Sequence, residues 1–174
     1  MTAPLPRLKP MPPESYSFRE VTRADYLQLR RWLAEPHVIA AWGPVEEEIA
    51  LIEAEIDGGD CAMHLVAANG TPIGFIQDWG VHEAGVPHFA DRPPGTRATD
   101  TFLGATSHLG KGHAKAYVRR YAEMLRASGA PAVVTDPRPT NPCGVAMYRG
   151  AGFEAFDTRI CEEGIPAICM QFRG

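Results

Sequence analysis

Apolar and polar positions along the chain predict strands and helices in mixed order. Residues 15–21 alternate, as in a strand that is buried on one face. A helix with an apolar stripe follows, opened by a capping sequence at Thr22 and closed before Pro36. The short apolar segment 38–44 then leads to an acidic helix over 44–56.

The middle of the chain carries a hairpin signal and a long irregular segment. Asn69 and Gly70 separate the strand-like runs 61–68 and 72–79, and this dipeptide is typical of a tight hairpin turn. Residues 80–97 lack periodicity and hold several prolines, so we expect a long loop, of the kind that often acts as a lid or binding loop.

A strand over 99–103, a turn at Gly110 and Gly112, and an amphipathic helix running to Ser128 come next. The apolar stripe of that helix recurs at spacings of three and four: Ala114, Tyr117, Val118, Tyr121, Met124 and Leu125. A buried strand over 130–135 follows.

The C-terminal part predicts one more helix and a hairpin. Asn141 is a suitable N-cap and Pro142 a suitable first helical residue. Two strands over 153–162 and 165–172 then form the last hairpin. With no internal repeat, we expect a single domain over 15–174 behind a proline-rich lead at 1–14.

Composition narrows the functional classes. The 174 residues are 45% hydrophobic and 22% charged, which is typical of a soluble globular domain. The formal charge of −4 argues against a general nucleic-acid binder and is compatible with a small cationic substrate. No apolar run is long enough to span a membrane, and five prolines in the first thirteen residues argue against a helical signal sequence.

Cysteines and histidines give no metal motif. The four cysteines form no C-x-x-C pair, which favours reduced thiols in a cytoplasmic protein over a disulfide framework or a zinc site. The six histidines show no ligand spacing on a predicted helix, so we assign them no chemistry, except that His113 in the glycine turn is a candidate to line a cofactor.

The glycine turn at 110–112 predicts an anion site. Glycines allow the backbone to approach a ligand, and the next N–H groups lie unpaired at a helix N-terminus, where Lys111 adds positive charge. The spacing matches neither a P-loop nor a dinucleotide fold, so a different phosphate-bearing cofactor is implied.

Two motifs resemble the GCN5-related N-acetyltransferase (GNAT) family. Leu109-Gly110-Lys111-Gly112-His113-Ala114 is similar to the family's Q/R-x-x-G-x-G/A pyrophosphate signature, with Leu109 departing from it. The run from Asn141 through Tyr148 to Gly152-Phe153 resembles a second family segment. The resemblance implies acetyl-CoA as cofactor and an α/β domain with a mostly antiparallel mixed sheet of about six to seven strands, flanked by about four helices. The implied cofactor contacts are Phe102, Leu103, Leu109, Gly110, Lys111, Gly112, His113, Ala114, Asn141 and Tyr148.

Asp100 and Tyr148 are the candidate catalytic residues. Asp100 shares a strand face with Phe102, where a carboxylate can bind a substrate ammonium and accept its proton, directly or through water. The Tyr148 phenol can donate to the departing thiolate. Asp136, at the carboxyl end of the next strand, is either a second ammonium contact or the start of a turn before Pro137.

Within the family the chain is most similar to aminoglycoside 6′-N-acetyltransferases. That resemblance implies a small-molecule amine substrate and direct attack in a ternary complex; the implied substrate contacts are Trp42, Gln77, Trp79, Asp100 and Asp136. Trp42 could equally be a core anchor. The departures lie in the substrate loops, where 83–91 has fewer carboxylates than the family and the last hairpin turn has Glu162-Glu163.

Two alternatives to the aminoglycoside remain open at this point. One is another amine or hydroxylamine, such as a siderophore precursor or an amino-acid derivative, and the other is an acyl-CoA sensor without turnover. We expect a monomer or homodimer with neither nucleic acid nor membrane as partner.

Overall fold

The computed structural model describes residues 15–174, so the proline-rich lead lies outside the described residues. Seven strands form one sheet in the order β1-β2-β3-β4-β5-β7-β6. All neighbours are antiparallel except β4 and β5, which run parallel. The strands are β1 (Tyr16–Glu20), β2 (Ala62–Ala68), β3 (Thr71–Gly80), β4 (Arg97–Leu103), β5 (Val133–Thr135), β6 (Phe153–Ile160) and β7 (Pro166–Phe172).

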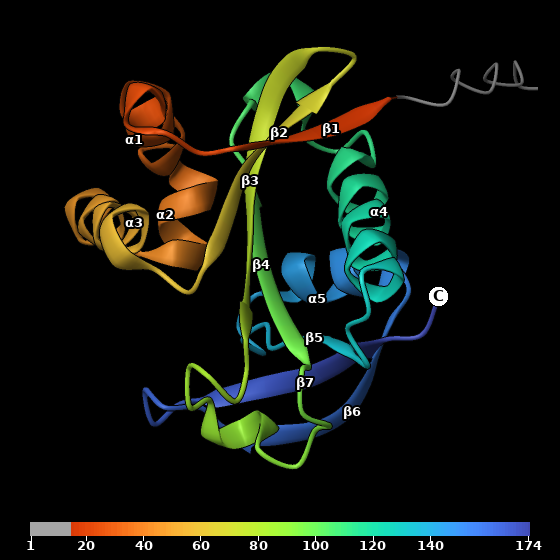
Figure 1. Ribbon diagram of the computed structural model, residues 1–174. Coiled ribbons are helices and arrows are strands. Elements are labelled where there is room, and N and C mark those ends of the chain that lie inside the picture. The colour runs from red at the N-terminus through yellow and green to blue at the C-terminus, as the bar shows by residue number, and fades with distance from the viewer. Residues whose placement is uncertain (1–14) are drawn as a thin grey trace, which may run out of the picture.

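Helices cover both faces of this sheet. Figure 1 shows α1, α2 and α3 on one side, with α4 and α5 on the other. Their bounds are α1 (Tyr26–Leu33), α2 (Pro36–Trp42), α3 (Val45–Gly58), α4 (His113–Ala127) and α5 (Pro142–Gly150). None of the helices described over residues 15–174 has the length and apolar character needed to cross a membrane.

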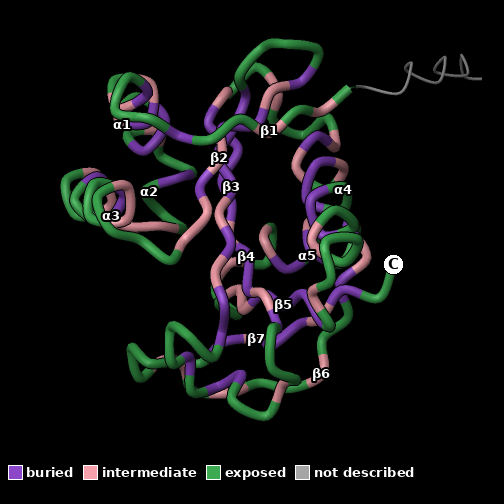
Figure 2. Tube along the Cα trace, viewed as in Figure 1, coloured by how far each residue is buried: buried purple, intermediate pink, exposed green. Residues whose placement is uncertain are grey.

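A hydrophobic core lies on each face of the sheet. Figure 2 shows buried positions along the central strands and on α4. On one face, Leu29 and Trp32 of α1 pack with Phe75 and Phe102. On the other, Tyr117 of α4 packs against the sheet with no exposed surface. Because helices cover both faces, most positions of the central strands β3 and β4 are buried, on both sides of the sheet.

Most predicted elements are confirmed. The turn between β2 and β3 has Asn69 and Gly70 at φ of 49° and 83°, as a tight hairpin requires. The Asn141 side chain caps α5 by accepting a hydrogen bond from the Gly144 N–H at 3.0 Å. Thr22 opens the first helical segment through a capping box with Asp25.

Several expectations need correction. Segment 38–44 belongs largely to a helix, α2, because Pro36, which ends the preceding helical pattern, is the first residue of the next one. β5 is shorter than predicted, and Met124 is 44% exposed rather than part of the buried stripe. The loop 80–97 contains a short 3-10 helix (Pro87–Phe89) and buries Val81 and Phe89 completely or nearly so.

Candidate active site

The parallel strands β4 and β5 separate soon after they pair. Their register includes only Arg97↔Val133 and Ala98↔Val134, whereas β4 continues to Leu103. The Arg97 N–H donates to Ala132 O, on the side of β5. Because the backbone polar groups of successive residues point to opposite sides of a strand, those of Thr101 and Leu103 point to this side too, where β5 no longer covers β4. An extended ligand can therefore add along this edge of β4.

Phe102 itself does not present its backbone there. It pairs with Phe75 of β3, and its ring lies 4.9 Å from that of Trp42. Of the two predicted backbone contacts for the cofactor, Phe102 and Leu103, only Leu103 has its backbone on the open edge of β4. Its carbonyl accepts a hydrogen bond from His37 Nε2 at 2.8 Å. His37 was assigned no chemistry from the sequence.

The glycine turn lies at the start of α4. Gly110 and Gly112 have φ of 70° and 84°, a region that disfavours other residues. The helix's first backbone hydrogen bond runs from Ala116 N to Gly112 O, so the preceding N–H groups have no helical acceptor. Lys111 is exposed beside them, and together these groups form a site suited to a phosphate-bearing ligand.

The other predicted cofactor residues differ in their orientation. Leu109 is 40% exposed in the turn. The His113 side chain is buried and lies 3.0 Å from the Tyr16 hydroxyl, so its ring points inward rather than toward a ligand in the turn. Ala114 is partly buried against the core of that face.

A cleft of about 470 Å³ opens beside the carboxyl end of β5. It brings together seven of the residues singled out from the sequence, namely Trp42, Gln77, Trp79, Asp100, Asp136, Asn141 and Tyr148. Trp42 both lines the cleft and packs on Phe75 and Phe102, so its two expected roles coexist. Gln77 lies directly across from Asp100 in the β3–β4 register.

Asp100 is the electrostatic centre of the cleft. Burial raises its pKa to about 7, assisted by the negative charge of Asp136 and opposed by hydrogen bonds. Those bonds come from the Thr101 N–H at 2.8 Å and the Tyr148 hydroxyl at 3.3 Å. Burial also raises the pKa of Tyr148 well above its ordinary value, so this phenol stays protonated and donates. A carboxylate with a pKa near neutrality can accept a proton from an ammonium group.

The cleft is more acidic than the sequence pattern indicated. Glu48 of α3 lines it, and burial together with nearby Glu47 and Glu163 raises the Glu48 pKa. Glu162 and Glu163 of the last hairpin turn also line it. Glu48 could have been suspected only as one carboxylate in an acidic helix, because nothing local shows which side of the helix faces a ligand.

Cations at the cleft are few. Arg138 is the only one among the lining residues, and it is bound to Glu163 at 2.6 Å. Buried His88, from the loop between β3 and β4, lies beside the cleft and contacts Asp136 Oδ2 through Nε2 at 2.8 Å. Four acidic side chains thus remain without an arginine or lysine partner inside it: Glu48, Asp100, Asp136 and Glu162.

Comparisons with known proteins agree with this geometry. An aminoglycoside N(6′)-acetyltransferase type 1 of Klebsiella pneumoniae is 29% identical over 166 residues, covering 90% of this chain and 82% of that protein. A kanamycin resistance protein of Rhizobium radiobacter is 37% identical over 78 residues, covering 44% and 71%.

Solved structures agree as well. The structure of AAC(6′)-Ib with paromomycin and acetyl-CoA superposes with a TM-score of 0.77 at 29% identity, covering 91% of this chain and 93% of that one. The family model described as the acetyltransferase (GNAT) domain matches residues 21–159, which is most of the chain. With the open β4 edge and the glycine turn before α4, this protein belongs to the GNAT acetyltransferase family.

Proposed function

We propose that this protein transfers the acetyl group of acetyl-CoA to a primary amine, and that the acceptor is the 6′-amino group of an aminoglycoside. The observation that carries the proposal is a carboxylate with a raised pKa, Asp100, that lines an acidic cleft beside the open edge of β4. The relatives named above, which are aminoglycoside acetyltransferases, support the choice of acceptor.

The residues present fit acetyl-CoA. Unpaired N–H groups before α4 and the side chain of Lys111 suit a pyrophosphate, and the β4 edge suits the extended amide-containing arm. When bound, this group supplies an activated acetyl thioester. Leu109, Gly110, Lys111 and Gly112 form the proposed cradle, whereas His113 contributes its backbone because its ring is buried.

Asp100 performs the proton step in this proposal. An ammonium must lose a proton before its nitrogen can attack a carbonyl carbon, and a carboxylate Oδ with a pKa of about 7 can take that proton near neutral pH. Asp136 contributes negative charge that favours the cationic acceptor. It also keeps the Asp100 pKa high, so the second carboxylate serves both binding and basicity.

Tyr148 lines the same cleft as Asp100. Its hydroxyl donates to Asp100 Oδ1 at 3.3 Å, and its raised pKa keeps the hydrogen on oxygen. A long hydrogen bond of this kind is readily redirected to another acceptor. We propose that Tyr148 stabilises the departing thiolate by donating a hydrogen bond to it.

The unpaired acidic side chains make a polycation the best-matched acceptor. Each exposed ion pair is worth only about 0.2–1 kcal/mol, so recognition requires several at once. An aminoglycoside with several ammonium groups can meet Glu48, Asp136 and Glu162 while one amine faces Asp100. A monoamine would engage fewer of them.

The test is thiol release from acetyl-CoA with pairs of aminoglycosides that carry either an amine or a hydroxyl at the 6′ position. Turnover restricted to the 6′-amines is the expected result. Turnover with other amines or hydroxylamines alone would replace the acceptor, and tight acetyl-CoA binding without any turnover would indicate a sensor. The monomer or homodimer state and the cytoplasmic location stay predictions.

A further inference from the structure

His88 occupies an unusual position for a buried side chain. It belongs to the short 3-10 helix of the loop between β3 and β4, and its side chain is 1% exposed. Its Nε2 lies 2.8 Å from Asp136 Oδ2, and its Nδ1 lies 3.4 Å from Glu162 Oε2. The imidazole therefore lies between two carboxylates that line the acceptor cleft but come from different loops.

The two nitrogens have different roles. A carboxylate only accepts hydrogen bonds, so Nε2 carries the hydrogen and donates to Asp136. Nδ1 makes no hydrogen bond, although it is buried, and an unmet buried nitrogen is costly. Glu162, whose side chain is 61% exposed, is the group beside it.

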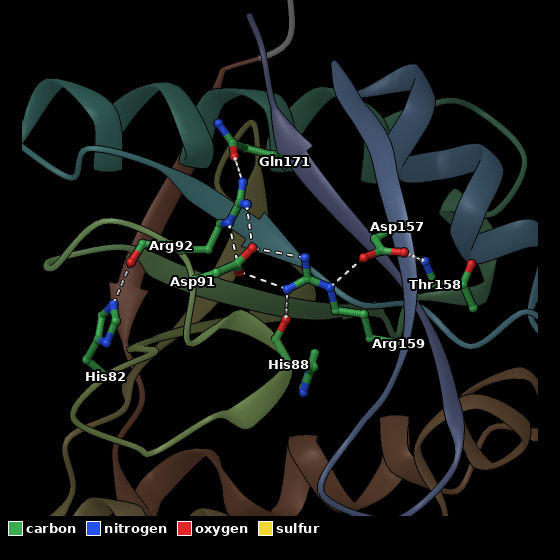
Figure 3. A network of polar contacts seen from close by, with 8 residues as sticks. All are labelled: His82, His88, Asp91, Arg92, Asp157, Thr158, Arg159 and Gln171. Carbon is green, nitrogen blue, oxygen red and sulfur yellow. Dashed lines mark hydrogen bonds and ion pairs between the residues drawn. The ribbon is translucent and has the colours of Figure 1, made fainter.

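The loop is fastened so that His88 keeps this position. Arg159 of β6 donates to the His88 carbonyl at 2.8 Å and binds both oxygens of Asp91 (Figure 3). Arg92 reaches Gln171 of β7 at 3.1 Å. Both guanidinium groups lie over the ring of Phe156, at 4.5 and 5.4 Å.

This fastening differs from the contact in the cleft. Arg159 holds the loop through the His88 carbonyl and the exposed Asp91 carboxylate, whereas the His88 imidazole contacts Asp136. The loop therefore reaches the cleft through an imidazole that lies behind Asp136, and His88 itself does not line the cleft.

We propose that His88 is a positioning residue for the acceptor: it fixes the Asp136 carboxylate through Nε2–H, and so determines how strongly the cleft holds a polyamine. The proposal rests on the proposed function, because it concerns the same cleft. His88 contacts the carboxylates and has no part in the proton step at Asp100.

Three substitutions separate the hydrogen bond from packing. His88→Gln places an amide donor near the Nε2 position, His88→Asn places one near Nδ1, and His88→Leu fills the space without a donor. We expect His88→Leu to raise the KM for an aminoglycoside about tenfold, the change that corresponds to loss of a hydrogen bond to a charged group. The kcat and the KM for acetyl-CoA should remain near wild type, and His88→Gln should restore the KM better than His88→Asn.

The matched control is His82, in the same loop. Its Nε2 lies 2.8 Å from the Arg92 carbonyl (Figure 3), so it also ties the loop together, but it is exposed and its partner does not line the cleft. His82→Leu should leave the KM unchanged. The effect of His88→Leu should also grow with the number of ammonium groups on the acceptor. Equal changes in KM for His88→Leu and His88→Gln, or for His82→Leu, would overturn the proposal in favour of loop packing.

A second readout does not depend on the acceptor. Nitrogen NMR of the His88 imidazole in the wild-type protein should show hydrogen on Nε2, and Asp136→Asn should alter that signal. If the wild-type protein shows this NMR signature but does not acetylate any aminoglycoside, the proposed function alone is refuted. An imidazole that is insensitive to Asp136→Asn would refute the positioning role alone.

Discussion

Two aspartates on adjacent strands, Asp78 and Asp100, differ in the groups that contact their carboxylates. Asp78 of β3 faces α4 and is 2% exposed; Arg97 binds it through Nε at 2.7 Å, and the Tyr121 hydroxyl also donates to it. Asp100 of β4 faces the cleft and receives hydrogen bonds from the Thr101 N–H and the Tyr148 hydroxyl. Among residues 15–174, no cationic side chain forms an ion pair with it.

This difference distinguishes a carboxylate that stabilises the fold, Asp78, from one that can take part in proton transfer, Asp100. A buried carboxylate that is paired with a guanidinium group contributes to the fold, because removing either partner leaves the other charge buried and unpaired. A buried charge without a cation is instead pushed toward its neutral form, and its pKa rises toward the working pH. Substitutions at the two positions should therefore have opposite consequences for activity and for stability.

The largest effect is expected for Asp100→Asn. Loss of the proton acceptor should lower kcat about 10²- to 10⁴-fold, the usual contribution of a general base. Steady-state thiol release with saturating acetyl-CoA measures it. A kcat within a few fold of wild type would mean that water removes the proton unaided.

Asp78→Asn should lower stability and leave chemistry intact. It leaves Arg97 without its partner, and we expect the free energy of unfolding to fall by about 2–4 kcal/mol, somewhat reduced because Arg97 reaches solvent. Urea unfolding monitored by fluorescence gives this value. Below the unfolding transition kcat should match wild type, and a large loss of kcat there would contradict the separation.

Asp100→Asn should also stabilise the protein in a pH-dependent way. The folded pKa of about 7 exceeds the unfolded value near 3.9, so the wild type loses stability as pH rises between them, and the ionised form is the less stable one. At pH 8 the variant should be more stable by about 1–2 kcal/mol after allowance for solvent screening. The advantage should vanish at pH 4, and melting curves at both values check this.

Tyr148→Phe should have the smallest of these effects, a change in the apparent pKa of Asp100. The hydroxyl favours the ionised form of Asp100 through its 3.3 Å hydrogen bond, so its removal should raise the apparent pKa of the rate profile. At pH 8.5, where Asp100 is ionised in both proteins, the remaining loss of kcat reports on the thiolate. A profile shifted downward would contradict the direction of this hydrogen bond.

Local signals were sufficient for much of the fold. The Asn69-Gly70 turn, the cap at Asn141 and the amphipathic spacing of α4 depend on neighbours in the sequence, and all three are confirmed. Helix α2 was missed because it has seven residues, too few for a periodic pattern, and because Pro36 was interpreted only as a stop.

Candidate site residues could be predicted only where a sequence motif or a strand end marks them. Asp100, Asp136 and Tyr148, which line one cleft, could be singled out as candidates because a strand end or a family segment marks each one. Glu48, which lines the cleft, and His88, which contacts Asp136 from behind it, could not, since their positions depend on how α3 and the loop after β3 fold back against the sheet. The parting of β4 from β5 likewise results from pairing between distant segments.

The most direct test of the account is the pH dependence of kcat/KM for acetyl transfer, measured for wild type and Asp100→Asn from pH 5.5 to 8.5. The wild-type rate should rise about tenfold per unit at low pH and level off near pH 7, where Asp100 becomes ionised. The variant should lose that limb. An identical limb in both proteins would show that another group accepts the proton, and the contrast between Asp78 and Asp100 would then not explain catalysis.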